Sequence, residues 1–376
     1  MKIQPFKLER YFAAHEFSAP YLMCASNCES LSLSELLSLA DEDSRNMWND
    51  LKLGYTESQG HHVLREEISR LYKNIKPNEV LVLTPEEGIY IAMTTLLKKG
   101  DHVVVTYPGY QSLYEIANSL GCEVSKWTPK EQKGWAFDID DLRALIRNKT
   151  RLIVVNFPHN PTGATISRAD LKKITGIAER KGIVLFSDEM YRFLEYGEAD
   201  RLPSASDLSA TAVSLFGMSK SFSLAGLRIG WLTTKNSVMF KDFASTKDYT
   251  TICSSAPSEI LAIMALRAKD RILKRNLDLI GKNLDLLNGF FSEYARLFEW
   301  HKPKAGPIGF PRLKSGLKTA AFCADVLKKK GVLLLPADQY GYEGNNFRVG
   351  FARRNMPEAL EKLREYVRKF WDTTRN

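Results

Sequence analysis

The feature that most constrains the fold is an alternation, from residue 79 onward, of short apolar runs with longer amphipathic segments. The apolar runs are 79–83, 102–107, 122–127, 151–157 and 183–189. The segments between them carry helix signals: Thr84 is a preferred N-cap residue, Pro85 follows it, and Gly100 ends the pattern. Strands that alternate with helices form parallel sheets covered on both faces. We therefore predict an α/β fold whose mainly parallel sheet lies in a three-layer α/β/α sandwich.

The pattern changes after residue 255. A long amphipathic helix is predicted over 258–295, and a second α/β unit follows it. The elements of this unit are a helix at 321–331, strands at 332–336 and 346–352, and a closing helix at 357–371. We predict a large domain over residues 45–265 and a smaller α+β domain made from residues 1–44 and 266–376.

Charge and composition exclude several classes of function. The formal net charge is +9, but the basic residues are dispersed among acidic ones, which favours a solvated surface over a nucleic-acid interface. No apolar run approaches the roughly 20 residues that span a bilayer, and the first residues lack the apolar core of a signal peptide, so no membrane contact and a cytoplasmic location are expected. The five cysteines form no metal-ligand pattern and suit reduced thiols. No metal site is predicted.

Polar side chains follow several of the predicted strands. These residues are Thr84, Pro85 and Glu86, then Tyr110, Asn160, Asp188, Tyr191 and Lys220. Ligands of α/β sheets bind outside the carboxyl ends of the strands, so these side chains are expected to share one site.

The ordered motifs NFPHNPTGA, SDEMY, SLFGMSKSFSLAGLRIGW and NFRVGFA carry a resemblance that covers nearly the whole chain. In this order and at these separations they resemble the class I/II aminotransferases, which are fold type I pyridoxal-phosphate enzymes. The resemblance implies a seven-stranded sheet in the large domain and pyridoxal 5'-phosphate as cofactor. Amino acids and 2-oxo acids are the implied substrates.

The resemblance also implies roles for individual residues. Lys220 matches the lysine that holds the cofactor as an internal aldimine and later moves the substrate proton. Asp188 matches the carboxylate that pairs with the pyridinium nitrogen, and Tyr191 and Asn160 match the donors to the phenolic oxygen of the cofactor. Tyr110 falls where an aromatic ring stacks on the cofactor. Lys220, Asp188 and Tyr191 are thus the predicted catalytic residues.

Three further residues match positions that bind anions. Arg228 matches the arginine that grips the cofactor phosphate, and Arg348 matches the one that takes the substrate α-carboxylate. Tyr55 lies where the family sends a tyrosine across the dimer interface to the phosphate of the neighbouring subunit. The resemblance therefore implies a homodimer with shared sites.

The phosphate-binding segment departs from the family pattern. Thr84, Pro85 and Glu86 stand where the family commonly has Gly-Ala/Ser-Ser, and Gly217 stands where it commonly has a hydroxyl residue, with Ser219 as the nearest substitute. Pro85, Glu86 and Ser219 remain predicted cofactor contacts, since the helix N-terminus can still bind phosphate. We expect the Glu86 carboxylate to turn away from the phosphate.

The N-terminal segment is most similar to that of the branch containing capreomycidine synthase, and in the family this segment lines the side-chain pocket. Ser26, Asn27 and Glu29 are therefore candidates for substrate recognition, with loop or capping roles as alternatives; in the substrate-binding set Asn27 joins Arg348 and Asn160. A carboxylate at Glu29 would favour a cationic substrate side chain.

Three functions follow from these patterns. The first is a pyridoxal-phosphate aminotransferase with a ping-pong reaction through Lys220. The alternative within the same cofactor class is a lyase, racemase or cyclase, such as a cyclase of the capreomycidine synthase type acting on a modified amino acid. A non-catalytic sensor is disfavoured, because such regulators carry a DNA-binding domain for which the short N-terminal segment leaves no room.

Overall fold

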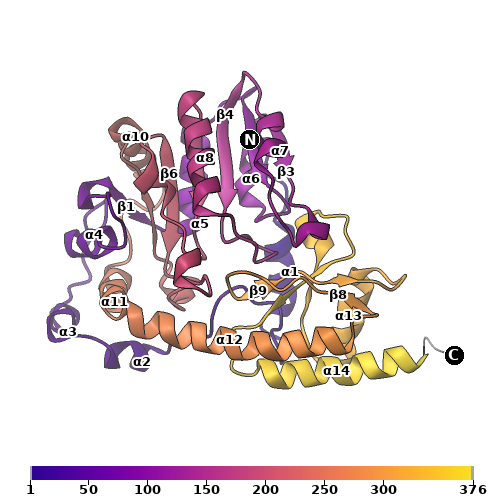
Figure 1. The fold of residues 1–376 in the computed structure, drawn as a ribbon. Helices are drawn as coiled ribbons and strands as arrows, with labels where there is room; N and C mark the ends of the chain where they lie inside the picture. The colour runs from indigo at the N-terminus through magenta and orange to yellow at the C-terminus, as the bar shows by residue number, and fades with distance from the viewer. Residues whose placement is uncertain (1, 374–376) are drawn as a thin grey trace.

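A seven-stranded sheet forms the centre of the computed structural model, which describes residues 2–373 (Figure 1). Its strands run in the order β1-β7-β6-β5-β4-β2-β3. Their bounds are Val80–Leu83 (β1), His102–Thr106 (β2), Glu123–Trp127 (β3), Thr150–Asn156 (β4), Val184–Asp188 (β5), Ala212–Gly217 (β6) and Gly230–Thr233 (β7). Only β7 runs antiparallel to its neighbours, whereas the pairs from β6 to β3 are parallel. The predicted mainly parallel seven-stranded sheet is confirmed.

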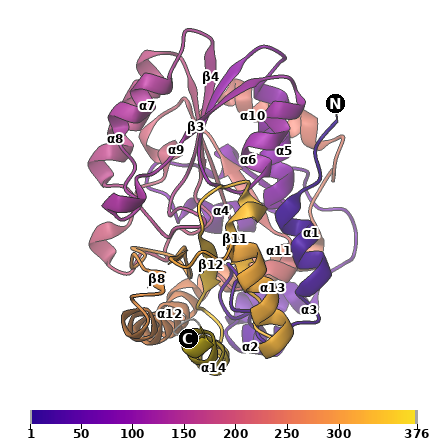
Figure 2. The ribbon, with the colours of Figure 1, turned by 90° about the vertical axis from the view of Figure 1, so that its right-hand side faces the viewer.

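Helices cover both faces of this sheet, as Figure 2 shows. One face carries α5 (Pro85–Leu96), α6 (Ser112–Ser119) and α10 (Ser237–Lys247), and the other carries α7 (Ile139–Leu145), α8 (Arg168–Arg180) and α9 (Ala205–Leu208). Side chains cap several of these helices: Ser167 Oγ accepts from Asp170 N at 3.0 Å at the start of α8, as a preferred N-cap residue does. The strands between the layers are apolar on both sides, so β4 and β5 are almost fully buried.

The smaller α+β part follows the sheet in the chain. Its elements are α11 (Ala256–Arg267), α12 (Lys269–Glu293), β8 (Phe298–Glu299), β9 (Ile308–Gly309), β10 (Arg312–Leu313), α13 (Thr319–Lys330), β11 (Leu335–Pro336), β12 (Phe347–Gly350) and α14 (Met356–Thr373). The strands form a sheet in the order β11-β12-β9 and a two-stranded sheet of β10 with β8. The long helices α12 and α14 lie side by side along the base of the molecule (Figure 1).

Four helices precede the sheet. They are α1 (Lys7–His15), α2 (Leu33–Ser38), α3 (Glu42–Asn49) and α4 (His62–Ser69). Helices α2, α3 and α4 pack on α11, whereas α1 packs on the one-turn helix Ala337–Tyr340 of the smaller part. Four other short 3-10 helices connect elements, at Pro77–Glu79, Glu131–Lys133, Glu198–Asp200 and Ala225–Leu227. The domain boundaries at residues 45 and 265 stay predictions.

Two predicted elements differ in the structure. The single long helix over 258–295 is two helices that meet at Ala268, because α11 packs on α2 to α4 while α12 turns away to lie along α14. The strand predicted over 332–336 is extended only at Leu335–Pro336. Val332 instead forms an isolated bridge with Tyr21, and Val332, Leu333 and Leu334 are fully buried.

None of the helices within the described residues is both long enough and apolar enough to cross a membrane. The sheet and the smaller part enclose a cleft at the carboxyl ends of β4, β5 and β6, and most of the predicted site residues lie there.

Candidate active site

The cleft has a volume of about 540 Å³, in the range of small-molecule sites. It brings together every predicted catalytic, cofactor-binding and substrate-binding residue except Tyr55. The predicted residues that line it are Asn27, Pro85, Glu86, Tyr110, Asn160, Asp188, Tyr191, Ser219, Lys220, Arg228 and Arg348. Tyr55 is 92% exposed in the single chain and lies outside the cleft, so its predicted role requires a second subunit.

Lys220 reaches the cleft from the loop after β6. Its Nζ donates a hydrogen bond to Ser26 Oγ at 2.9 Å. Burial, and next the positive charge of Arg348, lower the pKa of Lys220 to about 8, while Glu9 and Asp188 oppose this shift. An amine with this pKa loses its proton far more readily than an exposed lysine, which suits a nucleophile or a base.

Asp188 is the last residue of β5, so its carboxyl group lies at the carboxyl edge of the sheet. Its Oδ1 accepts from Met190 N at 3.0 Å. Burial raises the pKa of Asp188 to about 7, against the effects of this hydrogen bond and of Lys220. A cation placed against this buried carboxylate would hold it in the ionised form.

Tyr191 lies beside the same edge and is buried. Burial raises the pKa of its phenol to about 12, although Arg348 and a hydrogen bond with Ser26 oppose the shift. The phenol is therefore a neutral hydrogen-bond donor at ordinary pH.

Arg348 comes from β12 and is only 1% exposed, yet part of its guanidinium lines the cleft. Its Nε donates to the Cys24 carbonyl at 3.0 Å, and its Nη1 donates to Tyr340 Oη at 2.6 Å and to Asn160 Oδ1 at 3.2 Å. Tyr340 donates in turn to Asn160 Oδ1 at 2.8 Å. These bonds hold the guanidinium, and within the described residues Nη2 makes no hydrogen bond. One edge of a fixed cation thus remains available to a ligand.

The opposite end of the cleft is formed by the N-terminus of α5 and by Arg228. Thr84 Oγ1 donates to the Arg228 carbonyl at 3.0 Å, which joins the helix end to the arginine loop. Arg228 has a left-handed φ of 55°, a conformation uncommon outside glycine and frequent at functional sites. A helix N-terminus beside a guanidinium forms an anion-binding site.

Glycine at position 217 has a structural cause. A Cβ there would lie 2.9 Å from Gly230 Cα, 3.0 Å from the Ile229 carbonyl oxygen and 3.1 Å from Pro85 Cγ. At Gly230 a Cβ would approach Pro85 Cγ to 2.7 Å. Pro85 therefore packs on two glycines, and a hydroxyl residue at 217 would not fit.

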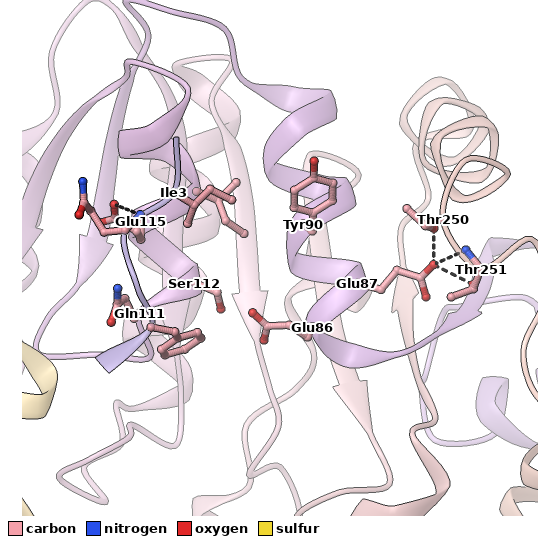
Figure 3. Close-up of a pocket in the computed structure, with 12 residues that line it drawn as sticks. Ile3, Glu86, Glu87, Tyr90, Gln111, Ser112, Glu115, Thr250 and Thr251 are labelled. Carbon is pink, nitrogen blue, oxygen red and sulfur yellow. Dashed lines mark hydrogen bonds between the residues drawn. The ribbon is translucent and has the colours of Figure 1, made fainter. Parts of the chain in front are cut away.

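The expectation that Glu86 turns away from the phosphate stays a prediction, although the side chain itself lines the cleft. Glu86 lines both the cleft and a neighbouring pocket of about 530 Å³, and it points toward Ser112, whereas Glu87 points toward Thr250 and Thr251 (Figure 3). Burial raises the pKa of Glu86, and the nearby Ser112 hydroxyl opposes this shift.

Of the three candidates in the N-terminal segment, Ser26 and Asn27 line the cleft and Glu29 does not. Asn27 Oδ1 accepts from Arg353 Nη2 at 3.2 Å. Glu29 instead accepts from Arg354 N at 2.9 Å and lies 3.9 Å from the Arg353 guanidinium. Its carboxylate is thus engaged by neighbouring basic residues outside the cleft.

Sequence reasoning missed the contribution of α1. Phe6, Glu9, Phe12 and Glu16 from this helix and its ends line the cleft. Glu9 accepts a hydrogen bond from Tyr110 Oη at 3.0 Å, and the Phe6 and Tyr110 rings lie 4.9 Å apart. The spacing of 9, 12 and 16 is the i, i+3, i+7 spacing of one helix face, which was the available signal.

The side chains of the cleft fit a phosphorylated aldehyde cofactor with a basic ring nitrogen. Lys220 is an amine that can add to an aldehyde, Asp188 is a buried carboxylate that prefers a cationic partner, and Arg228 with the end of α5 suits a phosphate. Glu86 is the one cleft carboxylate that opposes a dianion at that end.

Comparisons with known proteins agree with this fit. The profile of the family Aminotransferase class I and II matches residues 39–365. Capreomycidine synthase from Streptomyces vinaceus is 29% identical over 293 residues, which make up 77% of this chain and 75% of that protein. A PLP-dependent aminotransferase from Streptococcus suis superposes with a TM-score of 0.92 at 32% identity, over 98% of this chain and 99% of that one. The PLP-dependent cyclase OrfR gives a TM-score of 0.88 at 25% identity, over 98% of each chain.

The fold is that of the fold type I pyridoxal-phosphate enzymes. The chain belongs to the class I and II aminotransferase family. Its cofactor is pyridoxal 5'-phosphate.

Proposed function

We propose that this protein is an aminotransferase that moves the amino group of an α-amino acid to a 2-oxo acid in two successive half-reactions. The observation that carries the proposal is one buried amine, Lys220, in a cleft that also holds the buried carboxyl of Asp188 and the partly free guanidinium of Arg348. Bound pyridoxal phosphate supplies an aldehyde that condenses with amines and a ring that accepts electrons.

In this proposal Lys220 is both the attachment point of the cofactor and the base that moves the substrate proton. Burial and Arg348 lower the pKa of its amine to about 8, so a usable fraction is neutral near that pH. Ser26 Oγ, at 2.9 Å, orients the free amine within the cleft. The negative charge of Asp188 would keep the ring nitrogen of the cofactor protonated. The Tyr191 phenol would donate a hydrogen bond to an oxygen of the cofactor.

Arg348 binds the α-carboxylate of the substrate through the Nη2 edge of its guanidinium. Asn160 and Tyr340 fix the other edge, so little conformational entropy is lost when the carboxylate binds. Because every α-amino acid has this carboxylate, the contact orients all substrates alike and leaves the choice among them to other residues.

The proposal extends to the assembly of the enzyme. Tyr55 is 92% exposed, and an exposed aromatic at this position suits contact with the phosphate site of a second subunit. We propose a homodimer with shared sites, acting in the cytoplasm.

A second candidate is a pyridoxal-phosphate lyase or cyclase. It is supported by the likeness to capreomycidine synthase and to the cyclase OrfR. Lys220 would remove the same substrate proton in either reaction, and the fate of the substrate side chain would separate the two.

The test is to load the purified protein with pyridoxal phosphate and to add single amino acids without a 2-oxo acid. The aminotransferase proposal predicts stoichiometric loss of the visible band of the lysine-bound cofactor, formation of pyridoxamine phosphate and one equivalent of 2-oxo acid. The Lys220→Ala variant should lose the band and the reaction, whereas Lys282→Ala, at an exposed site on α12, should retain both. Product formation beyond one equivalent, with the band regenerated, would instead support the lyase or cyclase. Unchanged turnover in Lys220→Ala would refute both.

A further inference from the structure

One face of α1 brings two carboxylates and a phenyl ring to the cleft. Glu9, Phe12 and Glu16 all line it, and their spacing places them along one side of the helix. The Arg348 guanidinium lies 5.7 Å from the centre of the Phe12 ring. This face of α1 is therefore part of the same cavity as the residues that hold the α-carboxylate.

Under the proposed function, every cation of the cleft has a partner in the bound state. Arg228 takes the phosphate, Arg348 takes the α-carboxylate, and Lys220 is attached to the cofactor. Asp188 takes the ring nitrogen. The carboxylates on α1 have no such partner, and they leave the part of the cleft next to Phe12 negatively charged.

The two carboxylates on α1 differ in their surroundings. Glu9 already accepts the hydrogen bond from Tyr110 Oη at 3.0 Å. Glu16 is half-buried, and within residues 2–373 its carboxylate makes neither a hydrogen bond nor an ion pair, although its backbone N–H donates to the Phe12 carbonyl at 2.8 Å. A half-buried carboxylate without a partner gains most from a cation brought by a ligand.

An independent observation marks this cavity as a ligand site. Arg348 is 1% exposed and lines the cleft, and its Nη2 makes no hydrogen bond among the described residues. A buried guanidinium with a free edge indicates a carboxylate ligand. A molecule that pairs with both the Arg348 guanidinium and the Glu16 carboxylate carries a carboxylate and a cation.

We propose that the substrate of this site is an amino acid with a cationic side chain, guanidinium or ammonium, and that the Glu16 carboxylate binds this cation while the aliphatic stem packs on Phe12. The Glu9 carboxylate adds to the negative potential of the same face. This inference rests on the proposed function, because it takes Arg348 as the site of the α-carboxylate. It identifies Glu16 as the residue that distinguishes substrates by their side chains, which the contact at Arg348 cannot do because all α-amino acids share it.

The experiment uses calorimetric titration of the cofactor-loaded protein with carboxylates that have no α-amino group and so cannot react. The probes are δ-guanidinovalerate, its uncharged analogue δ-ureidovalerate, δ-aminovalerate and the dianion adipate. We expect both cationic probes to bind about ten- to a hundredfold more tightly than δ-ureidovalerate, the range for a charge-assisted hydrogen bond in a partly buried site, and adipate to bind most weakly. The ratio between the two cations distinguishes guanidinium from ammonium.

The variant Glu16→Gln keeps the shape of the side chain and should remove most of the preference for cationic probes. Glu115→Gln is the matched control, because it makes the same charge change outside the cleft and should leave the preference intact. If δ-ureidovalerate or adipate binds the unmodified protein as tightly as the cations, the inference is wrong and the proposed function stands. If no carboxylate binds, Arg348 is not the anchor and both fall. Should Glu16→Gln fail to fold, the probe series on the unmodified protein still decides.

Discussion

Replacing Asp188 by asparagine should stabilise the protein without its cofactor. The Asp188 carboxyl is 5% exposed, and burial raises its pKa from 3.8 to about 7. Asparagine is close in shape and never ionises, and its side-chain oxygen can still accept the hydrogen bond from Met190 N. The substitution therefore removes the cost of ionising a buried carboxyl and little else.

The magnitude follows from the pKa difference. Between pH 3.8 and 7 the folded state holds a proton on Asp188 that the unfolded chain has released, so the free energy of unfolding falls as pH rises through this window and is constant above it. Each pH unit is worth about 1.4 kcal/mol. The advantage of Asp188→Asn should thus grow from about 1.5 kcal/mol at pH 5 to about 4 kcal/mol at pH 8.

The assay is urea unfolding of the cofactor-free protein at pH 5, 6, 7 and 8, followed by circular dichroism. Asp285→Asn, at an exposed position of α12, is the control and should give a difference that is small at every pH. A stability gain for Asp188→Asn that does not change with pH, or no gain at all, would refute the claim that burial governs this carboxyl.

Adding pyridoxal phosphate should reduce the stability advantage of the variant. A ligand that binds only the folded state stabilises it by RT ln(1 + [L]/Kd), and the positive ring nitrogen favours Asp188 over asparagine. The unmodified protein should therefore gain more from a given cofactor concentration than the variant. An equal gain in both proteins would show that Asp188 does not face the ring nitrogen.

Three further substitutions test other parts of the cleft. Arg348→Ala should weaken binding of all α-amino acids alike, by about 2–5 kcal/mol, in calorimetric titrations; a loss confined to certain side chains would contradict the α-carboxylate contact. Glu86→Gln should lower the Kd for pyridoxal phosphate roughly fivefold, or about 1 kcal/mol, because it removes a carboxylate near a dianion. The assay is a fluorescence titration of the cofactor-free protein. An unchanged or weaker affinity would show that Glu86 does not face the phosphate. Tyr55→Phe should weaken the binding of pyridoxal phosphate by about 1 kcal/mol, or roughly fivefold in Kd, and only in the dimer. The difference between the two proteins should therefore disappear when they are diluted below the dimer dissociation constant, with dissociation monitored by sedimentation.

Most of the sheet and most of the site could be predicted from the sequence for the same physical reason. Buried strands of a parallel sheet need apolar runs, and such runs are readable in a single sequence. The polar residues that follow these runs must emerge at one edge, so Asp188 and Lys220 were placed together without knowledge of the remaining contacts.

The parts that could not be predicted depend on packing between distant segments. Nothing in the local sequence breaks the helix at Ala268; the break follows from the different partners of α11 and α12. Val332 lies in an apolar run that resembles a strand, yet its bridge partner is Tyr21, more than three hundred residues earlier. The place of α1 over the cleft also depends on such contacts, among them the hydrogen bond from Tyr11 Oη to the Leu334 carbonyl at 2.8 Å.

The altered phosphate end shows how a local departure can be compensated within one site. Backbone atoms of Ile229 and Gly230, together with Pro85 Cγ, occupy the space that a side chain at 217 would need, so a hydroxyl residue does not fit there. Pro85 lacks an N–H but occupies the first turn of α5, where an N–H has no partner within the helix, and Thr84 Oγ1 ties that turn to the Arg228 loop. We therefore expect the phosphate to be bound by backbone N–H groups and the Arg228 guanidinium rather than by side-chain hydroxyls. On this reasoning, Gly217→Ser should impair folding rather than improve cofactor affinity, because its Cβ would lie within 3.1 Å of three atoms of the sheet and of Pro85.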